Sequence, residues 1–173
     1  MTLRSHLHVR GHVGSQVSGL ARRTWLIARL PYSGGRWMQR DGAGVLYTSL
    51  AREGALAEIS FHWGQLNPRP TKPVVLHRLR VVAHRTLRLV RADLSQLGVS
   101  ESAYTGVNIP RTQEIGAAVE FLGCDGLIAP CARWACDNLM LFPDRMGVDA
   151  TLEIVSSEAI DWVAWAAEKG LLT

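Results

Sequence analysis

Arg36, Tyr47 and Glu58 are the side chains in the first third of the chain whose types and spacing could support chemistry. Arg36 directly follows a Gly-Gly turn. Glycine lets a backbone come close to a ligand, and a guanidinium placed there can bind a phosphate through paired hydrogen bonds. Glu58 has Ala57 and Ile59 beside it, and such neighbours can remove a carboxylate from water, which is how a working carboxylate is usually prepared. Local pattern alone leaves open an ordinary loop arginine and a solvated helix glutamate.

Three successive predicted elements carry these side chains. A compact apolar run at Thr24–Leu30 predicts a buried strand, and the Gly-Gly turn with its arginine follows it. The run Val45–Ser49 is rich in β-forming residues and predicts a second strand, on which Tyr47 lies. Ser49 is a suitable N-cap for the helix that follows, which carries Glu58 near its middle.

The rest of the chain alternates irregularly between predicted strands and helices. Residues 74–82 and 85–90 alternate apolar and polar positions, which predicts two antiparallel strands with one solvated face. Asp93 and Thr112 are the predicted N-caps of the next two helices. Short strands are then expected at 125–130, 139–142 and 151–155, and a last helix at 157–169. Because a regular βαβ order is missing, the pattern favours an α+β fold over a doubly wound sheet.

The whole chain, 1–173, is expected to form one domain, because 173 residues is a usual domain size and is enough for a hydrophobic core. A hydrophobic content of 47% and a charged content of 20% are ordinary for a globular protein. No apolar run approaches the roughly 20 residues of a membrane span, and the N-terminal residues lack the apolar segment of a signal peptide. We therefore expect a soluble, cytoplasmic protein with no membrane partner.

The cysteines and histidines do not predict a metal site. Cys124, Cys131 and Cys136 are odd in number and contain no CxxC pair, which argues against a disulfide framework and against structural zinc. Three histidines between residues 6 and 12 have spacings that suggest metal ligands, but a polar, frayed terminus is the favoured interpretation. We expect no bound metal.

The basic balance of the chain raises the question of nucleic-acid binding. The formal net charge is +4, and the arginines are spread along the chain instead of forming a basic arm. The most basic segment is His77–Arg91. Few aromatic residues lie between its cations as stacking platforms, so a solvated strand face is the favoured interpretation. Direct nucleic-acid binding is retained only as an alternative hypothesis.

Several separate motifs occur in an order that is typical of one protein family. GGRW is followed by VLYTS and by ALAE on the predicted helix, then by VRADLSQLGVS and by RTQEIGAAVEFLGCDGLIAPCARWACDNLMLF. From Ser33 to Phe142, this series resembles the RES domain, a family of bacterial toxins. The resemblance is specific because independent motifs keep both their order and their spacing.

The resemblance implies a set of site residues. The family is named for an arginine, a glutamate and a serine, and the first two correspond to Arg36 and Glu58. The serine position holds Cys131, since the sequence reads PCAR where the family usually has PSAR. A thiol is a weaker hydrogen-bonding group than a hydroxyl. The remaining positions implied are Tyr47 on the strand, Asn138 in the later loop, and a first-strand arginine for which Arg10 and Arg29 are the candidates.

By resemblance, the fold is that of ADP-ribosyltransferases, a split antiparallel sheet with flanking helices and a cleft for NAD. The activity implied is destruction of NAD by cleavage of its nicotinamide–ribose bond, with phosphate or water as the acceptor. NAD is then a substrate, and no cofactor is implied.

Each candidate residue has a role in that reaction. Glu58 would stabilise the oxocarbenium-like state, as carboxylates do in other glycosidic cleavages. Arg36 would hold the diphosphate and Tyr47 would stack on the nicotinamide or the ribose. A covalent role for the thiol is less favoured, because no histidine is set beside it by sequence. Direct contacts to the substrate would come from Cys131, Asn138 and Arg10.

The resemblance also implies a partner, an antitoxin with an Xre-like helix-turn-helix domain, so nucleic acid is expected to be contacted only through it. A homo-oligomer is a further possibility, because Trp162 and Trp165 on the last predicted helix could form a partner surface. Core packing is the favoured interpretation of those two side chains. The cysteine at the serine position leaves a second hypothesis open, a catalytically silent RES-fold protein that acts by binding a nucleotide or a partner.

Overall fold

The computed structural model describes residues 14–17, 20–27, 34–107 and 109–172. Arg10, Arg29 and the three N-terminal histidines lie outside these residues. The strands are β1 Ser15–Val17, β2 Leu20–Ile27, β3 Leu46–Ser49, β4 Val74–Ala83, β5 Thr86–Arg88, β6 Gly126–Pro130, β7 Asp137–Leu141 and β8 Thr151–Ile160. The helices are α1 Arg52–Gly64, α2 Arg91–Gln96, α3 Glu101–Thr105, α4 Pro110–Phe121 and α5 Trp162–Glu168, with a short 3-10 helix at Pro143–Arg145.

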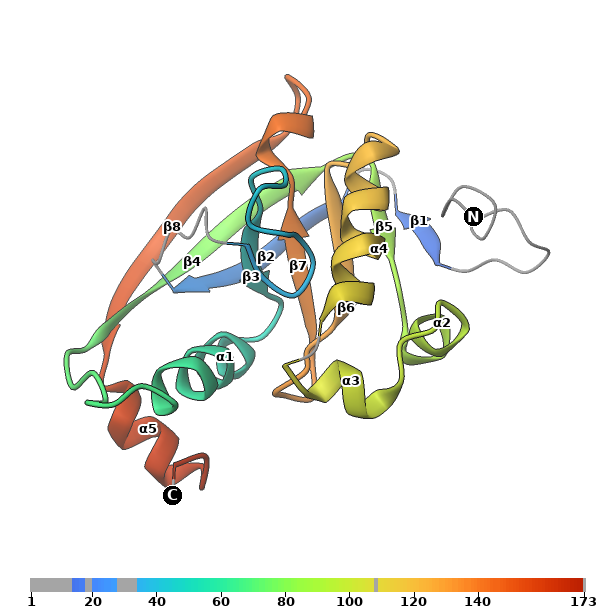
Figure 1. Cartoon of the computed structure of the whole chain (residues 1–173). Helices are drawn as coiled ribbons and strands as arrows, with labels where there is room; N and C mark the ends of the chain where they lie inside the picture. The colour runs from blue at the N-terminus through green and yellow to red at the C-terminus, as the bar shows by residue number, and fades with distance from the viewer. Residues whose placement is uncertain (1–13, 18–19, 28–33, 108, 173) are drawn as a thin grey trace.

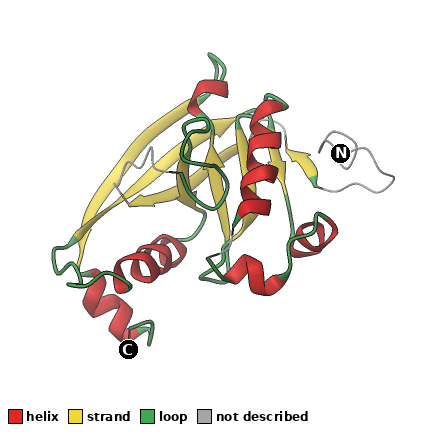
Figure 2. Ribbon diagram, in the orientation of Figure 1, coloured by secondary structure: helices red, strands yellow, loops and turns green. Residues whose placement is uncertain are grey.

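The described strands form one sheet in the order β1-β5-β6-β7-β3-β2-β4-β8, antiparallel except for the β5–β6 pair. Among the described residues, Trp25–Ser49 is the single pair in the ladder between β2 and β3, whereas β2 pairs with β4 along its whole length. The sheet is thus nearly divided at this point. Figures 1 and 2 show β2, β4 and β8 running away from the strands on the other side of the divide. The predicted α+β class with a split, mainly antiparallel sheet is confirmed.

Helix α1 follows β3 at the divide and contacts β2, β3 and α5. Its apolar side, with Leu56 and Trp63, packs against β4 and against Trp162 of α5. The Trp63 and Trp162 rings meet edge to face with their centroids 5.6 Å apart. Trp162 is fully buried. It is therefore a core residue, which agrees with the favoured interpretation of the sequence. This core fixes α1 over the end of β3.

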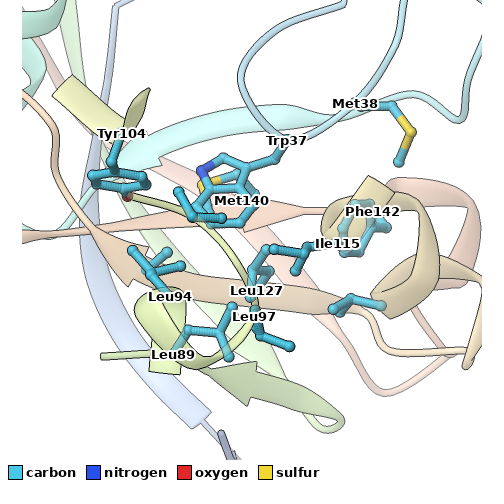
Figure 3. Packing of buried hydrophobic residues seen from close by; sticks show 13 residues of the cluster. Trp37, Met38, Leu89, Leu94, Leu97, Tyr104, Ile115, Leu127, Met140 and Phe142 are labelled. Atoms are coloured by element: carbon cyan, nitrogen blue, oxygen red, sulfur yellow. The ribbon is translucent and has the colours of Figure 1, made fainter. Parts of the chain in front are cut away.

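A second core lies between α4 and the strands β6 and β7. Figure 3 shows Trp37 beside Met140, with Tyr104 and Leu127 close by. All four side chains are almost fully buried. Trp37 belongs to the turn that precedes β3, so this core attaches that turn to the body of the protein.

The predicted antiparallel pairing of residues 74–82 with 85–90 is wrong. Strand β4 pairs with β2 and β8, whereas β5 pairs with β1 and, in parallel, with β6. The buried Asp125 carboxylate explains the separation. It accepts hydrogen bonds from the backbone N–H groups of His84 (2.6 Å) and Arg85 (3.0 Å), which turns the chain toward β6.

The predicted start of the last helix at residue 157 is also wrong. Strand β8 continues to Ile160, because its pairing with β4 extends over Ser157 and Glu158. Helix α5 begins only after Asp161, whose carboxylate accepts a hydrogen bond from the Ala164 N–H at 3.0 Å. Long-range strand pairing outweighs the local Ser-Ser-Glu signal for a helix start.

Three predicted helix caps also differ from the structure. Ala51 is the N-cap of α1, and the Ser49 hydroxyl accepts a 3.4 Å hydrogen bond from its N–H. Ile109 is the N-cap of α4, and Thr112 donates to the Ile109 carbonyl at 2.9 Å. In α2 the N-cap is Val90, and the Asp93 carboxylate accepts a hydrogen bond from its N–H at 2.8 Å.

Candidate active site

The Glu58 carboxylate is held by two donors from the β6–β7 hairpin. Cys131 Sγ donates to Glu58 Oε1 at 3.3 Å, and Asn138 Nδ2 donates to the same oxygen at 3.1 Å. The other oxygen, Oε2, lies 3.9 Å from His62 Nε2, one turn further along α1. The Glu58 side chain is 28% exposed. The carboxylate is therefore oriented and partly withdrawn from water, while part of it remains accessible.

The hairpin brings its polar side chains to one face of the sheet. Side chains alternate between faces along a strand, so Cys136 and Asn138, two residues apart, share a face. Ala129 of β6 pairs with Asn138, and Cys131 follows Ala129 by two residues on the same face. The Cys131 N–H donates to the Cys136 carbonyl at 2.8 Å, which continues the ladder past the end of β6. The hairpin register thus presents Cys131, Cys136 and Asn138 together.

Arg36 is fixed by the C-terminal end of α3. Its Nη1 donates to the Tyr104 carbonyl at 2.5 Å and its Nη2 to the Gly106 carbonyl at 3.1 Å. Its guanidinium carbon also lies 5.2 Å from the centre of the Tyr104 ring. Since a guanidinium carries five N–H donors, two carbonyl acceptors orient it and leave donors for a ligand.

Tyr47 supports the turn that carries Arg36. The Tyr47 hydroxyl accepts a hydrogen bond from the Trp37 N–H at 3.1 Å. Burial raises the pKa of Tyr47 to about 12, so the phenol stays neutral. A Cβ added to Gly35 would lie 2.7 Å from Tyr47 Oη, a distance that real Cβ atoms do not adopt. The glycine before Arg36 is therefore required for this close contact.

Helix α4 holds the same turn from the other side. A Cβ on Gly116 would lie 1.7 Å from the Trp37 carbonyl oxygen, so the helix backbone and the turn are in direct contact. Gln113, one helical turn earlier, donates to the Gly35 carbonyl at 2.9 Å. These contacts position the Arg36 turn by packing that is distant in sequence.

Tyr104 of α3 lies beside two arginines of the site. Its position in the sequence did not predict this contact. The guanidinium carbons of Arg36 and Arg91 lie 5.2 Å and 4.8 Å from the centre of its ring. The buried Tyr104 hydroxyl donates to the Pro130 carbonyl at the end of β6. Burial raises the pKa of Tyr104, and the two arginines oppose that shift. One neutral aromatic ring therefore gathers two cations beside the hairpin.

Arg133, the arginine of the PCAR motif, is a third cation at the site. It donates to the Thr105 carbonyl at 2.5 Å, and its guanidinium carbon lies 3.3 Å from the centre of the Phe61 ring. Burial and the nearby Arg36 lower the pKa of Arg133, and Glu58 acts in the opposite direction. Sequence analysis did not single out Arg133, although the PCAR motif contains it.

An open depression of about 470 Å³ lies beside these groups. Its lining residues are Arg91, Cys131, Ala132, Arg133, Trp134 and Ala135. Within the described part of the chain, buried Arg133 Nε and Asn138 Oδ1 have no hydrogen-bond partner. Buried polar atoms are normally satisfied, so these two are available for a ligand. Two arginines line the depression, and Cys131, which also lines it, donates to the Glu58 carboxylate.

Cys131 and Cys136 titrate as a pair. The pKa of Cys136 is lowered to about 7, first by its hydrogen bond with Cys131 and also by the Ser49 hydroxyl, which lies 3.4 Å from Cys136 Sγ. The same contact, together with burial and the Glu58 charge, raises the pKa of Cys131. The Cys131 thiol therefore keeps its proton. Its single S–H has two acceptors within reach, Glu58 Oε1 at 3.3 Å and the Cys136 sulfur, and Cys136 is the member of the pair that ionises first.

The structure brings three of the predicted residues, Glu58, Cys131 and Asn138, into direct contact. Tyr104 lies beside Arg36 and donates to the carbonyl of Pro130, the residue before Cys131. Tyr47 contacts the Arg36 turn through the Trp37 N–H. No helix in the described ranges is long and apolar enough to cross a membrane. Within those same ranges, no group of three or more His, Cys, Asp or Glu side chains is placed to hold a metal ion.

Comparison with known proteins relates the chain to a protein family and to a solved structure. The sequence model of the RES domain matches residues 16–163. Comparison with curated protein sequences gives no match. Among solved structures, the chain is similar to one in the crystal structure of the M. tuberculosis MbcT-MbcA toxin-antitoxin complex, with a TM-score of 0.69 and 13% identity. The alignment covers 90% of this chain and 92% of that chain, so the two share a fold.

Proposed function

The chain belongs to the RES domain family, and from this premise we propose that it is a toxin that cleaves the nicotinamide–ribose bond of NAD, with phosphate or water as the acceptor. The observation that carries the proposal is the Glu58 carboxylate, oriented by Cys131 and Asn138 beside a depression lined by arginines.

Glu58 supplies the charge that the bond cleavage needs. As nicotinamide leaves, the ribose acquires oxocarbenium character, and a carboxylate close to it stabilises the positive charge. Both hairpin donors bind Oε1, so Oε2 is the oxygen left to face the ribose. Because the donors are already in place, the carboxylate needs no reorganisation in the transition state.

In this proposal, arginine side chains bind the diphosphate of NAD. Arg36 and Arg133 both donate to the Gly106 carbonyl, and Arg36 and Arg91 lie over the same Tyr104 ring. Guanidinium groups bind phosphate oxygens in pairs, with geometry as well as charge. In this proposal Tyr47 contributes by holding the Arg36 turn, and Asn138 Oδ1 contacts the sugar. The predicted first-strand arginine, Arg10 or Arg29, lies outside the described residues and stays an expectation.

The partner is proposed from the same family membership. The similar solved structure is described as a toxin-antitoxin complex. We propose that this chain likewise binds an antitoxin, of Xre-like helix-turn-helix type, and acts in the cytoplasm. Nucleic acid would be reached through that partner, and self-association of the chain is a further element of the proposal.

The test is incubation of the purified chain with NAD, with and without inorganic phosphate, followed by chromatography of released nicotinamide. Release that requires phosphate identifies a phosphorylase, and release without phosphate identifies a glycohydrolase. Absence of release in both conditions, from folded chain free of any antitoxin, overturns the proposed reaction. That outcome would favour the silent RES-fold alternative, in which Cys131 at the serine position marks loss of turnover.

A further inference from the structure

Cys131 and Cys136 are direct neighbours across the β6–β7 hairpin. Pro130 pairs with Asp137, and the next pair outward is Cys131 with Cys136, joined by the 2.8 Å backbone hydrogen bond. Hydrogen-bonded pairs of antiparallel strands have Cα atoms about 5.5 Å apart. Disulfides join Cα atoms about 4.4–6.8 Å apart, so a backbone pair of this kind is compatible with a disulfide.

Both thiols also point to the same surface of α1. Cys131 Sγ donates to Glu58, and a Cβ on Gly54 would lie 2.5 Å from Cys136 Sγ. Gly54 and Glu58 are four residues apart, so they lie on one face of the helix, one turn apart. Cys131 and Cys136 are paired across the hairpin, and both thiols contact the same face of α1. The two thiols therefore lie next to each other.

The two thiols have complementary chemical states. Cys136 is half-buried, and its contacts with Cys131 and Ser49 favour the thiolate near neutral pH. Cys131 is buried and stays protonated. A reachable thiolate beside a second thiol is the arrangement found where an oxidised cysteine is resolved as a disulfide.

We propose that Cys131 and Cys136 form a reversible oxidation site, in which a hydroperoxide converts the two thiols into a disulfide across the hairpin. The Cys136 thiolate attacks one peroxide oxygen and the O–O bond breaks, which gives a sulfenic acid at Cys136 and, after proton uptake, water. The Cys131 sulfur then attacks the Cys136 sulfur, and hydroxide leaves with the Cys131 proton as a second water. Two thiols are oxidised and one hydrogen peroxide is reduced to two waters.

The disulfide would change the candidate active site directly. The hydrogen that Cys131 donates to Glu58 is lost, and the Cys131 sulfur moves toward Cys136. The consequence for activity rests on the proposed function, because it assumes that Glu58 acts on NAD. Formation of the bond does not rest on that assumption, since it depends only on the hairpin and its thiols. A dithiol reductant would reverse the reaction by thiol–disulfide exchange.

The sequence allows a direct test, because Arg133 lies between the two cysteines. Trypsin cleavage after Arg111, Arg133 and Arg145 gives peptide 112–133, with Cys124 and Cys131, and peptide 134–145, with Cys136. The folded full chain is treated with hydrogen peroxide, remaining thiols are alkylated, and the digest is analysed by mass spectrometry. We expect the two peptides to be linked, and dithiothreitol to release them.

Matched variants identify the linked residues. Cys124→Ser should keep the link, while Cys136→Ser and Cys131→Ser should each lose it. If the parent chain yields only separate alkylated peptides after peroxide, or if Cys124→Ser abolishes the link, the proposal is overturned. This readout requires no NAD turnover, so its failure can be distinguished from failure of the proposed function.

A second measurement connects the bond to activity. In a chain that consumes NAD, peroxide should lower the rate at least tenfold and dithiothreitol should restore it. Cys136→Ser, which lacks the attacking thiolate, should retain its rate under peroxide. Equal peroxide sensitivity of the parent and of Cys136→Ser would contradict control of activity by this disulfide.

Discussion

Cys131 Sγ lies 3.3 Å from Glu58 Oε1, so the thiol at the predicted serine position is a hydrogen-bond donor to the carboxylate. The Cys131 pKa is raised, so the thiol keeps its proton and remains a donor. Asn138 donates to the same oxygen. Thus the carboxylate retains two oriented donors despite the change from the usual PSAR sequence.

Replacement of that carboxylate is expected to remove activity without unfolding the chain. Glu58→Gln keeps the side-chain shape and loses the charge that stabilises the oxocarbenium-like state, so nicotinamide release should fall by roughly 10²–10³-fold. Chromatography measures the release, and circular dichroism checks the fold. Glu53→Gln, in the first turn of the same helix, is the matched control and should stay close to the parent. A Glu58→Gln variant with parental turnover would refute the assigned role.

The hydrogen-bond donor at position 131 is expected to affect the rate of NAD cleavage. Cys131→Ser restores the stronger hydroxyl donor and should give a rate equal to or above that of the parent. Cys131→Ala removes the donor, and a lost hydrogen bond of about 1.4 kcal/mol corresponds to a tenfold lower rate. The NAD assay applied to both variants measures the difference. If Cys131→Ala were as active as Cys131→Ser, orientation of Glu58 by this residue would be excluded.

The contact between α4 and the Arg36 turn is expected to be sensitive to a single methyl group. Gly116→Ala places a Cβ 1.7 Å from the Trp37 carbonyl oxygen and must displace helix or turn. Overpacking of this kind costs about 1–3 kcal/mol or more in the free energy of unfolding, measured by urea denaturation. Gly44→Ala is the control, because a Cβ there meets no atom within 4 Å. Equal stability of the two variants would contradict the close contact.

The Cys136 thiol is expected to react at lower pH than an ordinary cysteine. Its pKa is lowered to about 7, so the thiolate forms as pH rises through 7, whereas a free cysteine needs about 8.5. Iodoacetamide labelling of peptide 134–145, followed by mass spectrometry over a pH series, should therefore have its midpoint near 7. Peptide 112–133 should label only at higher pH, since burial raises the pKa of Cys124 and the pKa of Cys131 is also raised.

The hydrogen bond with Cys131 is the main cause of the low Cys136 pKa. A variant that lacks the Cys131 thiol is therefore the control. Cys131→Ala should shift the labelling midpoint of peptide 134–145 to higher pH. A midpoint near 8.5 in the parent chain, or no shift in Cys131→Ala, would show that the pairing of the thiols does not lower the Cys136 pKa.

Much of the local structure could be predicted from the sequence. Runs of β-forming residues place β3 and β6 correctly, and helical periodicity places α1 and α4, because these signals depend on neighbouring residues. The ordered motifs also identified the family that the sequence model confirms. Glu58, Cys131 and Asn138 were chosen from those motifs, and the fold brings all three into contact.

The contacts between elements that are distant in sequence depend on strand pairing and tertiary packing. Strand pairing and packing energies depend on residues far apart in the chain, so no local pattern contains them. The buried Asp125 separates β4 from β5, and the β4 ladder extends β8 over an apparent helix start. The same cause placed Tyr104 beside Arg36 and Arg91 and set Cys131 opposite Cys136. The motifs alone identified Glu58, Cys131 and Asn138, because residue types are local information, whereas the sheet register and helix packing determined that they touch.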